Sequence, residues 1–492
     1  MVTVAAAPAL EFETIIGLEV HAQIVTKSKM FCGCNAAAFT SEPNTNVCPI
    51  CMGMPGVLPV INREAVRQAV RVALALHGDV QRESKFDRKN YTYPDLPKGY
   101  QISQYDLPLS RGGYVTVVTD DGEKQVGITR VHMEEDTGRS VHRTHRDGRG
   151  YSLVDLNRAG IPLLEIVSEP DMRSPEEARR YVETLRDLLR YIGASTGNME
   201  EGALRCDANI SLRPIGATAF GAKVEIKNVN SFRGVYRAIQ YEVRRQADVL
   251  RAGGTLTQET RGWSEDRGVT LPQRTKEFAD DYRYFPEPDL PTLVLSDAFI
   301  EEARQSLPEL PDARRHRYMT ALGLNLSDAT ALSESRDIGD YFEAILGGSD
   351  DHERARRAAA FITNDWFTLR NDRGLSLTDA PSHAALRDLI DLTDRGVISR
   401  STAKDVFVAM VETGKDARAI IDARGLAQQN DASEIEHLVE RAIAENPKAV
   451  ADYAKNPNAL GALIGAVMRM SKGTANNQVV REALIRRLAP PE

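Results

Sequence analysis

Four segments in the first half of the chain alternate between apolar and polar residues, a period of two that is typical of strands with one buried face. In the first of them, Leu18, Val20 and Ala22 alternate with Glu19 and His21. The segments are 16–23, 128–136, 204–213 and 222–227. We expect them to pair in an antiparallel sheet, whose polar face either lies in water or forms a binding site.

Helical periodicity predicts three helices among these strands, over about 63–76, 175–191 and 234–250. Asn62 can cap the first, and a capping box with Pro at the first helical position opens the second at Ser174. Beyond about Leu293 the chain is rich in Ala, Arg, Glu and Leu, with helical periodicity to its end. We therefore predict an α+β fold with an antiparallel sheet and flanking helices, followed by all-α domains. The predicted domain limits are 1–293, 294–348 and 349–492.

The polar residues on these strands differ from those of an ordinary solvent face, which favours Lys, Glu and Thr. His, Asp and Glu recur beside Asn and Arg, which are the residue types that bind metals and phosphate. Glu165 also interrupts the apolar run 163–167, where an ionised carboxylate needs a partner or a metal ion. An edge position or a structural ion pair would explain Glu165 equally well.

Four of the five cysteines lie within about twenty residues of one another, as C-x-C followed by C-x-x-C. Cys32, Cys34, Cys48 and Cys51 suit a tetrahedral Zn²⁺ site, and four protein ligands would make it structural and not catalytic. Buried or redox-active thiols are the alternative. Cys206 falls on an apolar strand face, so we expect it in the core.

Two segments, 85–104 and 273–289, combine tyrosines, prolines and basic residues with little apolar periodicity. Each is either a surface loop held by its prolines or a contact to a nucleotide or RNA. The candidate phosphate contacts are Lys89, Lys98, Arg274, Lys276 and Arg283, and the candidate stacking residues are Tyr282 and Tyr284.

The length, the net charge and the absence of several motifs argue against some classes of protein. A chain of 492 residues predicts two or three domains, and a net charge of −8 argues against a non-specific nucleic-acid binder. It has no apolar run long enough for a spanning helix and no signal-peptide pattern, so we expect no membrane contact and a cytoplasmic location. Phosphate-loop, dinucleotide and nucleophile-elbow motifs are absent. Any ATP would be held by a carboxylate-bound Mg²⁺ and scattered basic side chains.

Several motifs occur in the order of one known family and cover nearly the whole chain. They read GLEVHAQ, NTNVCPICMGMPGVLPV, FDRKNYTYPDLPKGYQISQ, HMEEDTGRS, LVDLNRAGIPLLEIVSEPD, MEEGALRCDANIS, EIKNVNSF, DYRYFPEPDLP and GALIGAVMRMSKGTANNQVVREAL. Together they resemble the B subunit of the aspartyl/glutamyl-tRNA(Asn/Gln) amidotransferases. One departure is Asn477, where the family usually has Pro.

The resemblance implies an N-terminal catalytic cradle, a helical linker domain and a helical tail domain that binds tRNA. It implies a complex with an amidase, the A subunit, which releases ammonia from glutamine, and with a small C subunit. The B subunit takes Glu-tRNA(Gln) or Asp-tRNA(Asn), phosphorylates the side-chain carboxylate with ATP and lets ammonia displace the phosphate. The chain lacks the Ser-Ser-Lys signature of amidases, so its ammonia must come from a partner.

The resemblance and the residue chemistry together suggest the site residues. The expected Mg²⁺ ligands are Glu19, His21 and either Glu134 or Glu135, with Asp207, Glu165 and Glu225 as second candidates. The expected phosphate contacts are Lys89 and Arg205, beside Lys98 and Arg283. The expected tRNA contacts of the tail are Arg469, Lys472, Arg481, Arg486 and Arg487. A non-catalytic tRNA-binding scaffold and a free-standing kinase or ligase for a small carboxylic acid remain alternatives, and whether Asn-tRNA, Gln-tRNA or both are made stays open.

Overall fold

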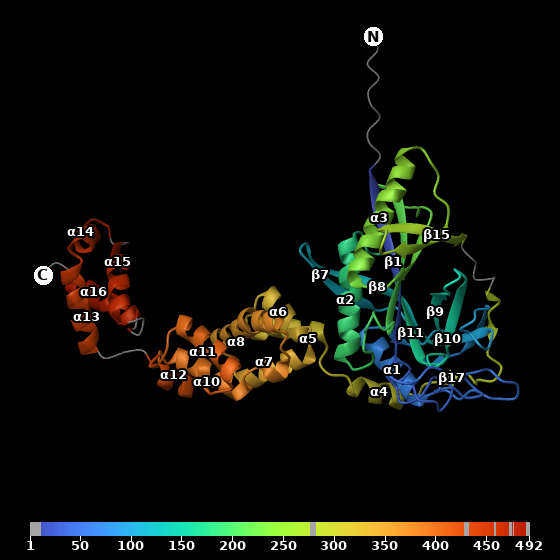
Figure 1. The fold of residues 1–492 in the computed structure, drawn as a ribbon, viewed down its shortest axis with the longest axis horizontal. Coiled ribbons are helices and arrows are strands. Elements are labelled where there is room, and N and C mark those ends of the chain that lie inside the picture. Colours follow the sequence, from blue (N-terminus) through green and yellow to red (C-terminus); the bar gives the residue numbers. More distant parts are fainter. Residues whose placement is uncertain are drawn as a thin grey trace, which may run out of the picture. The chain divides into compact units, whose positions relative to one another are not determined.

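The computed structural model describes residues 11–275, 282–427, 432–456, 459–471, 475 and 477–488. The chain forms two compact units, the first reaching Leu310 and the second beginning at Pro311 (Figure 1). The first unit contains all the strands, and the second contains helices alone within the described ranges. The predicted α+β class is confirmed.

A mixed sheet dominates the first unit. Its central strands are β12 (Leu204–Pro214), β1 (Phe12–Gln23), β11 (Pro162–Ser168) and β8 (Gly122–Glu135), which pair in that order and all antiparallel. The other strands of this sheet are β2 (Asp79–Val80), β4 (Asp87–Asn90), β5 (Tyr100–Ser103), β6 (Ser110–Arg111), β7 (Tyr114–Thr119), β13 (Val224–Val229), β14 (Glu259–Ser264), β15 (Val269–Thr275) and β16 (Phe285–Pro286). Two further pairs form separate two-stranded sheets: β9 (Arg139–Thr144) with β10 (Gly150–Asp155), and β3 (Glu83–Ser84) with β17 (Leu293–Val294).

One pair departs from the antiparallel prediction, because β13 and β14 run parallel. The helix α3 (Phe232–Arg251) lies between these two strands in the sequence. A helical crossover returns the chain to the same end of the sheet, and the next strand then runs in the same direction as the first.

The three predicted helices of this unit are present as α1 (Arg63–Ala75), α2 (Pro175–Tyr191) and α3. The side chain of Asn62 accepts hydrogen bonds from two backbone N–H groups at the start of α1, as expected. Ser174 caps α2 through the N–H of Glu177, whereas the Glu177 carboxylate accepts from the N–H of Arg173. The predicted capping box is therefore half formed.

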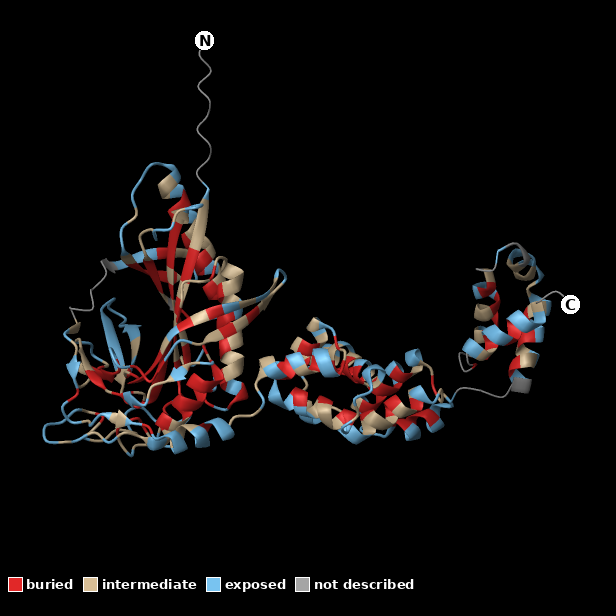
Figure 2. Cartoon of the chain, turned by 180° about the vertical axis from the view of Figure 1, so that it is seen from behind, coloured by how far each residue is buried: buried red, intermediate tan, exposed pale blue. Residues whose placement is uncertain are grey.

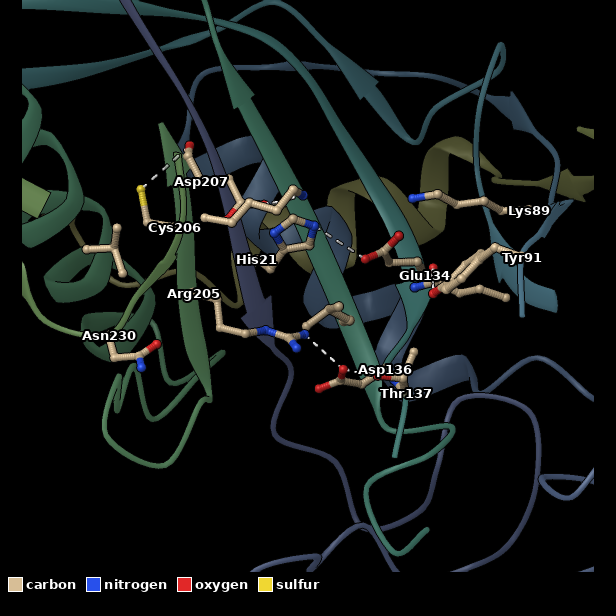
Figure 3. A pocket seen from close by; sticks show the side chains of 14 residues that line it. His21, Lys89, Tyr91, Glu134, Asp136, Thr137, Arg205, Cys206, Asp207 and Asn230 are labelled. Carbon is tan, nitrogen blue, oxygen red and sulfur yellow. Dashed lines mark hydrogen bonds and ion pairs between the residues drawn. The ribbon is translucent and has the colours of Figure 1, made fainter. Parts of the chain in front are cut away.

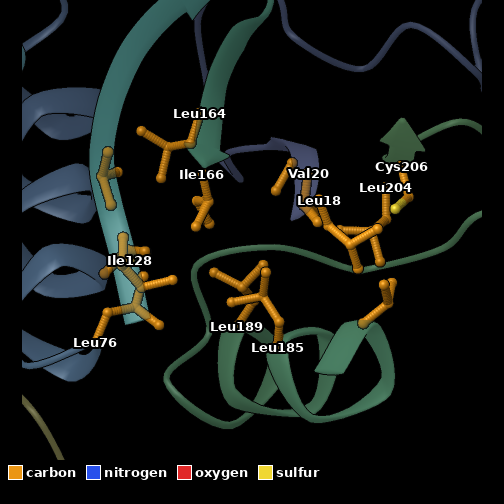
Figure 4. Packing of buried hydrophobic residues seen from close by; sticks show 14 of the residues in the cluster. Leu18, Val20, Leu76, Ile128, Leu164, Ile166, Leu185, Leu189, Leu204 and Cys206 are labelled. Atoms are coloured by element: carbon orange, nitrogen blue, oxygen red, sulfur yellow. The ribbon is translucent and has the colours of Figure 1, made fainter. Parts of the chain in front are cut away.

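The apolar sides of the central strands pack against these helices. Leu18, Val20 and Ile166 face Leu185 and Leu189 of α2 in one continuous core (Figure 4). Figure 2 shows buried residues concentrated where the helices cover the sheet. Cys206 belongs to this core, which confirms its prediction. The polar residues that alternate with the core positions consequently point to the opposite side of the sheet.

The second unit has two apolar cores. One extends from Tyr318 to Ile421, and the other from Ile435 to Leu484. Its helices are α5 (Pro311–Ala321), α6 (Leu326–Ser333), α7 (Arg336–Leu346), α8 (His352–Ala360), α9 (Phe367–Arg373), α10 (His383–Asp394), α11 (Arg400–Thr413), α12 (Ala417–Arg424), α13 (Ala432–Glu445), α14 (Pro447–Lys455), α15 (Leu460–Met470) and α16 (Asn477–Leu488), with short η2 (Phe361–Trp366) and η3 (Leu377–Asp379).

The helix α4 (Asp297–Gln305) follows the predicted limit at 293 but packs in the core of the first unit through Ala303. Residues on both sides of the predicted limit at 348 share one core, for example Phe342 and Leu389. The predicted domain limits therefore remain a prediction. Every helix in the described ranges is too short or too polar to cross a membrane.

Candidate functional site

Strand register brings polar residues from four distant segments into one row. His21 lies opposite Glu165 on β11 and opposite Arg205 on β12, and Glu165 lies opposite His132 on β8. The row therefore reads His132, Glu165, His21 and Arg205 across neighbouring strands. Because all four side chains point away from the apolar core, they meet on the polar face of the sheet.

A pocket of about 310 Å³ opens on this face (Figure 3). It is lined by His21, Lys89, Tyr91, Gln101, Glu134, Asp136, Thr137, Leu163, Arg205, Cys206, Asp207, Lys227, Val229 and Asn230. The structure thus brings together His21, Glu134, Asp207, Lys89 and Arg205 from the predicted residues, with Glu165 directly beside His21.

Two carboxylates and an imidazole form a potential metal site at this pocket. The ligand atoms of His21, Glu134 and Glu165 all lie within 4.8 Å of one another. His21 Nε2 is 3.4 Å from Glu165 Oε2 and 3.7 Å from Glu134 Oε1. His132 Nε2 lies 3.0 Å from Glu165 Oε2, so a second imidazole contacts the same carboxylate. The two carboxylates suit a hard divalent cation, whereas the imidazole is a ligand typical of transition metals.

The charges in this group reinforce one another. Burial by itself would lower the pKa of His21, but the Glu165 and Glu134 carboxylates raise it to about 9. Burial would raise the pKa of Glu165, but His132 and His21 hold it well below the usual value. The Glu165 carboxylate is therefore ionised beside a protonated His21, and a bound cation can take the place of the proton on His21.

Cationic side chains surround the carboxylates at the pocket wall. Arg205 Nη2 donates to Asp136 Oδ1 at 2.8 Å, and Lys227 Nζ donates to Asp207 Oδ2 at 2.9 Å. Lys89 makes no ion pair within the described ranges and contacts the faces of aromatic rings, among them Tyr282 at 5.0 Å. Lys89 is therefore the cation most available to an anionic ligand.

Three predicted acidic residues lie outside this group. Glu19 accepts a hydrogen bond from Asn209 Nδ2 at 2.8 Å, and Glu225 accepts one from Thr260 Oγ1 at 2.9 Å. Glu135 points to the other face of β8, where it forms a buried ion pair with Lys98. The alternation along β8 thus assigns Glu134 to the pocket and removes Glu135 and Lys98 from it.

One tyrosine of the second predicted loop contacts a residue that lines the pocket. Tyr284 stacks on Tyr105 with ring centroids 4.3 Å apart, and Tyr282 contacts Tyr91, a pocket residue, edge to face. Arg283 is exposed and is not among the residues that line the pocket. Lys276 and the tail residue Lys472 lie outside the described residues, as do the side-chain contacts of Arg274.

Sequence reasoning did not assign Asp136, His132 or Lys227 to the site, although all three occupy polar positions of the predicted strands. Burial would raise the pKa of Asp136, but Arg205, Arg158 and the amide of Gln23 lower it. Asp136 therefore stays ionised and fixes Arg205 at the pocket. The signal that could have revealed it is the unbroken alternation of His132, Glu134 and Asp136 along one strand.

The four clustered cysteines form a second group of potential metal ligands. Their sulfur atoms all lie within 4.8 Å of one another, although 15 residues lie between Cys32 and Cys48 in the sequence. The fully buried Lys29 places its Nζ 3.7 Å from Cys51 Sγ. The pKa of Cys51 is lowered to about 4 because Cys32 donates to it and Lys29 lies nearby. This group can hold a metal ion.

Two of the tail arginines expected to contact tRNA are engaged within the second unit. Arg486 Nη1 lies 3.5 Å from Glu436, and Arg487 Nη2 lies 2.6 Å from Glu440. Exposed pairs of this kind are weak, so a phosphate can compete for both arginines.

Comparisons with known proteins agree with this architecture. Residues 14–301 match the model of the GatB/GatE catalytic domain, and residues 340–488 match the GatB domain. The B subunit of aspartyl/glutamyl-tRNA(Asn/Gln) amidotransferase from Thermomicrobium roseum is 53% identical over 98% of this chain and 100% of its own length. The proteins of the same name from Moorella thermoacetica and Dehalococcoides mccartyi are 52% and 48% identical, over 97% and 96% of this chain and 100% and 98% of their own lengths. The resemblance inferred from the sequence motifs is confirmed, and the chain belongs to the family of aspartyl/glutamyl-tRNA(Asn/Gln) amidotransferase B subunits.

Proposed function

We propose that this chain is the kinase and transamidase subunit of an ATP-dependent amidotransferase. It phosphorylates the side-chain carboxylate of Glu-tRNA(Gln), Asp-tRNA(Asn) or both, and ammonia from a partner amidase then converts the product to the amide. The observation that carries this proposal is the pocket lined by His21, Glu134 and the cation Lys89, with Glu165 beside His21 and Glu134. A tRNA-binding scaffold has no need for such a convergence.

The chemistry explains why both kinds of group are needed. A carboxylate resists ammonia because its carbon is electron-rich and its oxygen is a poor leaving group. One carboxylate oxygen first attacks the terminal phosphorus of ATP, the bond to ADP breaks, and an acyl phosphate forms. Ammonia then attacks the carbonyl carbon and loses a proton, and phosphate leaves with the bonding electrons. Cations at the site offset the charge that builds up on the phosphoryl oxygens.

Lys89 and Arg205 are suited to bind the phosphates of ATP. Lys89 has no competing ion pair in the described part of the chain, and Arg205 is oriented by the buried Asp136. An oriented guanidinium loses little entropy when it binds an anion. The Lys227 ammonium is divided between Asp207 and Glu225, so it contributes to the electrostatics of the wall more than to direct binding.

His21, Glu134 and Glu165 fit a magnesium ion, because Mg²⁺ is bound by one or two carboxylates together with water and substrate phosphates. When bound, the ion would neutralise phosphate oxygens. Glu165 is held in place by His132, and Glu134 accepts a hydrogen bond from Ser103 Oγ at 3.2 Å. These contacts orient the two carboxylates before any ligand arrives.

The four cysteines fit structural zinc. Tetrahedral Zn²⁺ with Zn–S bonds of about 2.3 Å places its sulfurs about 3.8 Å apart. The observed sulfurs, within 4.8 Å of one another, are close to that arrangement. Four thiolates leave no position for substrate, and Zn²⁺ would therefore stabilise the loop 32–51 and take no part in the reaction.

The partners follow from the family and the chemistry. The names of the relatives call them subunits, and a chain without amidase signature needs a source of ammonia. We infer an assembly with the amidase (A) subunit and the small C subunit, in the cytoplasm where aminoacyl-tRNA is made. The second unit would bind the tRNA body through its tail.

The test is a reaction with the purified complex, Glu-tRNA(Gln), ATP, Mg²⁺ and ammonium chloride in place of glutamine. Glu134→Gln and Glu165→Gln should reduce Gln-tRNA formation by about 100-fold or more, since even outer-shell partners of a metal are worth about 10–100-fold. The affinity for tRNA should change little. Glu123→Gln, an exposed substitution on the same strand β8, is the matched control. Full activity of both pocket variants would show that the reaction does not take place in this pocket. The chain would then act as a tRNA-binding scaffold.

A further inference from the structure

The hairpin formed by β9 and β10 is strongly basic, although the chain as a whole is acidic. Residues 139–151 contain four arginines and two histidines against a single acid, Asp147, whereas the whole chain carries a net charge of −8. Arg149 pairs with Asp147 at 2.7 Å. Arg139, Arg143 and Arg146 make no ion pair with any described residue. Three uncompensated guanidinium groups on one short ribbon create a local positive field.

This hairpin projects from the unit as an exposed ribbon. Its two strands pair only with each other and do not join the main sheet. Most of its residues are exposed, as Figure 2 shows for the ribbon on the side of the sheet opposite α2 and α3. Tyr151 is 38% and Leu153 is 55% exposed, although neither is a typical solvent residue. An exposed ribbon with these residues is suited to contact a partner.

The base of the hairpin is part of the pocket wall. Asp136 and Thr137 line the pocket, and β9 begins two residues later. Arg158, just beyond β10, donates to the carbonyls of Thr137 and Gly138 at 3.0 and 2.7 Å. Asn44 Nδ2 donates to the carbonyl of Val154 at 3.0 Å and clamps the same end. The base is fixed while the tip is free, and strands of six residues reach about 20 Å from it.

One face of the ribbon combines charge with aromatic and apolar surface. The register places Arg143 opposite Tyr151 and Val141 opposite Leu153, so these four side chains share a face. The Tyr151 ring also contacts the His145 ring, with centroids 4.2 Å apart. Arginines that bind phosphate beside an aromatic ring that stacks on a base are the usual combination for RNA with unpaired nucleotides.

We propose that the β9–β10 hairpin is an RNA-binding arm that holds the acceptor end of the aminoacyl-tRNA while its aminoacyl group enters the pocket. This inference rests on the proposed function, because the substrate must deliver its amino acid to a pocket whose wall continues into the hairpin. Arg139, Arg143 and Arg146 contact phosphates, and Tyr151 stacks on a base near the 3′ end. An RNA fits better than an acidic protein, because the hairpin begins at the site that the RNA-linked group must reach.

The test compares two triple variants in the assembled complex. Arg139→Gln with Arg143→Gln and Arg146→Gln removes the unpaired charge of the hairpin. Arg190→Gln with Arg233→Gln and Arg244→Gln removes three exposed arginines of α2 and α3, on the opposite side of the sheet, and is the matched control. Binding of tRNA(Gln), and of a minihelix that contains only its acceptor stem and 3′ end, is measured from low to high salt.

The hairpin variant should weaken both RNAs by about tenfold or more and reduce the slope of log K against log salt by about 2 to 3, because each lost phosphate contact contributes about 0.7–0.9. In the activity assay, the KM of the hairpin variant for Glu-tRNA(Gln) should rise with the measured loss of affinity. Tyr151→Ala should weaken the minihelix by about fivefold or more without changing the salt slope, since stacking is not ionic.

Different results would contradict the proposed function and the RNA-binding role of the hairpin. If the wild-type complex makes no Gln-tRNA, the proposed function fails, while the binding curves still test the arm. If the wild type is active and both triple variants bind RNA equally well, the inference is overturned. If the hairpin variant instead loses its partner subunits on purification and binds RNA normally, the ribbon is a protein interface and the inference is wrong.

Discussion

Glu134 and Glu135 are neighbours in the sequence and occupy opposite environments. Glu134 faces His21 with a second carboxylate, Glu165, beside it, and Glu135 faces the ammonium of Lys98 and the N–H of Ile102 on the other side of the sheet. Successive side chains of a strand point to opposite faces of the sheet, so these two glutamates have different surroundings. Glu134 lies where it could bind a cation, whereas Glu135 neutralises the buried Lys98.

Lys29 illustrates how one buried charge can serve a metal site. Four thiolates around Zn²⁺ carry a net charge of −2, and Lys29 lies 3.7 Å from Cys51 Sγ. We expect purified wild-type protein to contain about one zinc per chain, and Lys29→Met to release it to a chromophoric chelator about 10–100-fold faster, because partners of metal ligands contribute on that scale. Lys27→Met, an exposed substitution two residues away, is the control. Equal release rates in the two variants would show that Lys29 plays no part in holding the metal.

At the scale of elements, close backbone approaches fix the helices against the sheet. The end of α1 meets the start of β7, where the N–H of Tyr114 donates to the carbonyl of Leu76 at 2.8 Å. Gly113 has a φ of +100°, and a Cβ there would lie 2.3 Å from that carbonyl oxygen. A larger residue must therefore separate α1 from β7, and the position requires glycine for space as well as for conformation.

The neighbouring Gly112 provides a test of this contact, since it also has a positive φ, of +65°, but nothing within 4 Å of its Cβ position. Gly112→Ala should cost about 1 kcal/mol in the free energy of unfolding, from backbone strain alone. Gly113→Ala should cost at least about 2 kcal/mol more, because the clash is with backbone and cannot relax by rotamer change. In a Trp366→Phe background, fluorescence of Trp263 reports urea unfolding of the first unit. Equal costs for the two variants would contradict the close approach.

At the scale of the whole molecule, the second unit contains two cores that can be separated by truncation. A cut after the predicted limit at 348 would divide one core, in which Phe342 and Ile345 pack with Leu389 and Ile390. A cut after residue 427 removes only the last core, which begins at Ile435. The second cut is therefore the appropriate way to test the tail.

Removal of residues 428–492 should weaken binding of tRNA by about tenfold or more, because the proposed phosphate contacts of Arg469 and Arg481 would be lost with it. Unfolding of the remaining helical core, followed through Trp366, should be unchanged. A truncated complex that binds tRNA like the full-length one would refute a role of the tail in binding. Loss of the Trp366 transition would instead show that the last core supports its neighbour.

Features that depend on neighbouring residues could be predicted from the amino-acid sequence. Alternation predicted which face of β1 and β12 is buried, since the strand period is a local property, and Asn62 and Ser174 predicted where two helices begin. The spacing of the cysteines predicted that Cys32 and Cys51 would meet. Family motifs supplied the identity, which no local pattern could provide.

Which distant residues share a site depends on how the strands pair in the folded chain. The row of His132, Glu165, His21 and Arg205 depends on strand register, which is set by pairing between segments far apart in the sequence. The same pairing selected Glu134 over Glu135, made β13 and β14 parallel, and left the basic hairpin projecting from the pocket wall. These outcomes follow from long-range packing, and a single sequence carries no local signal for them.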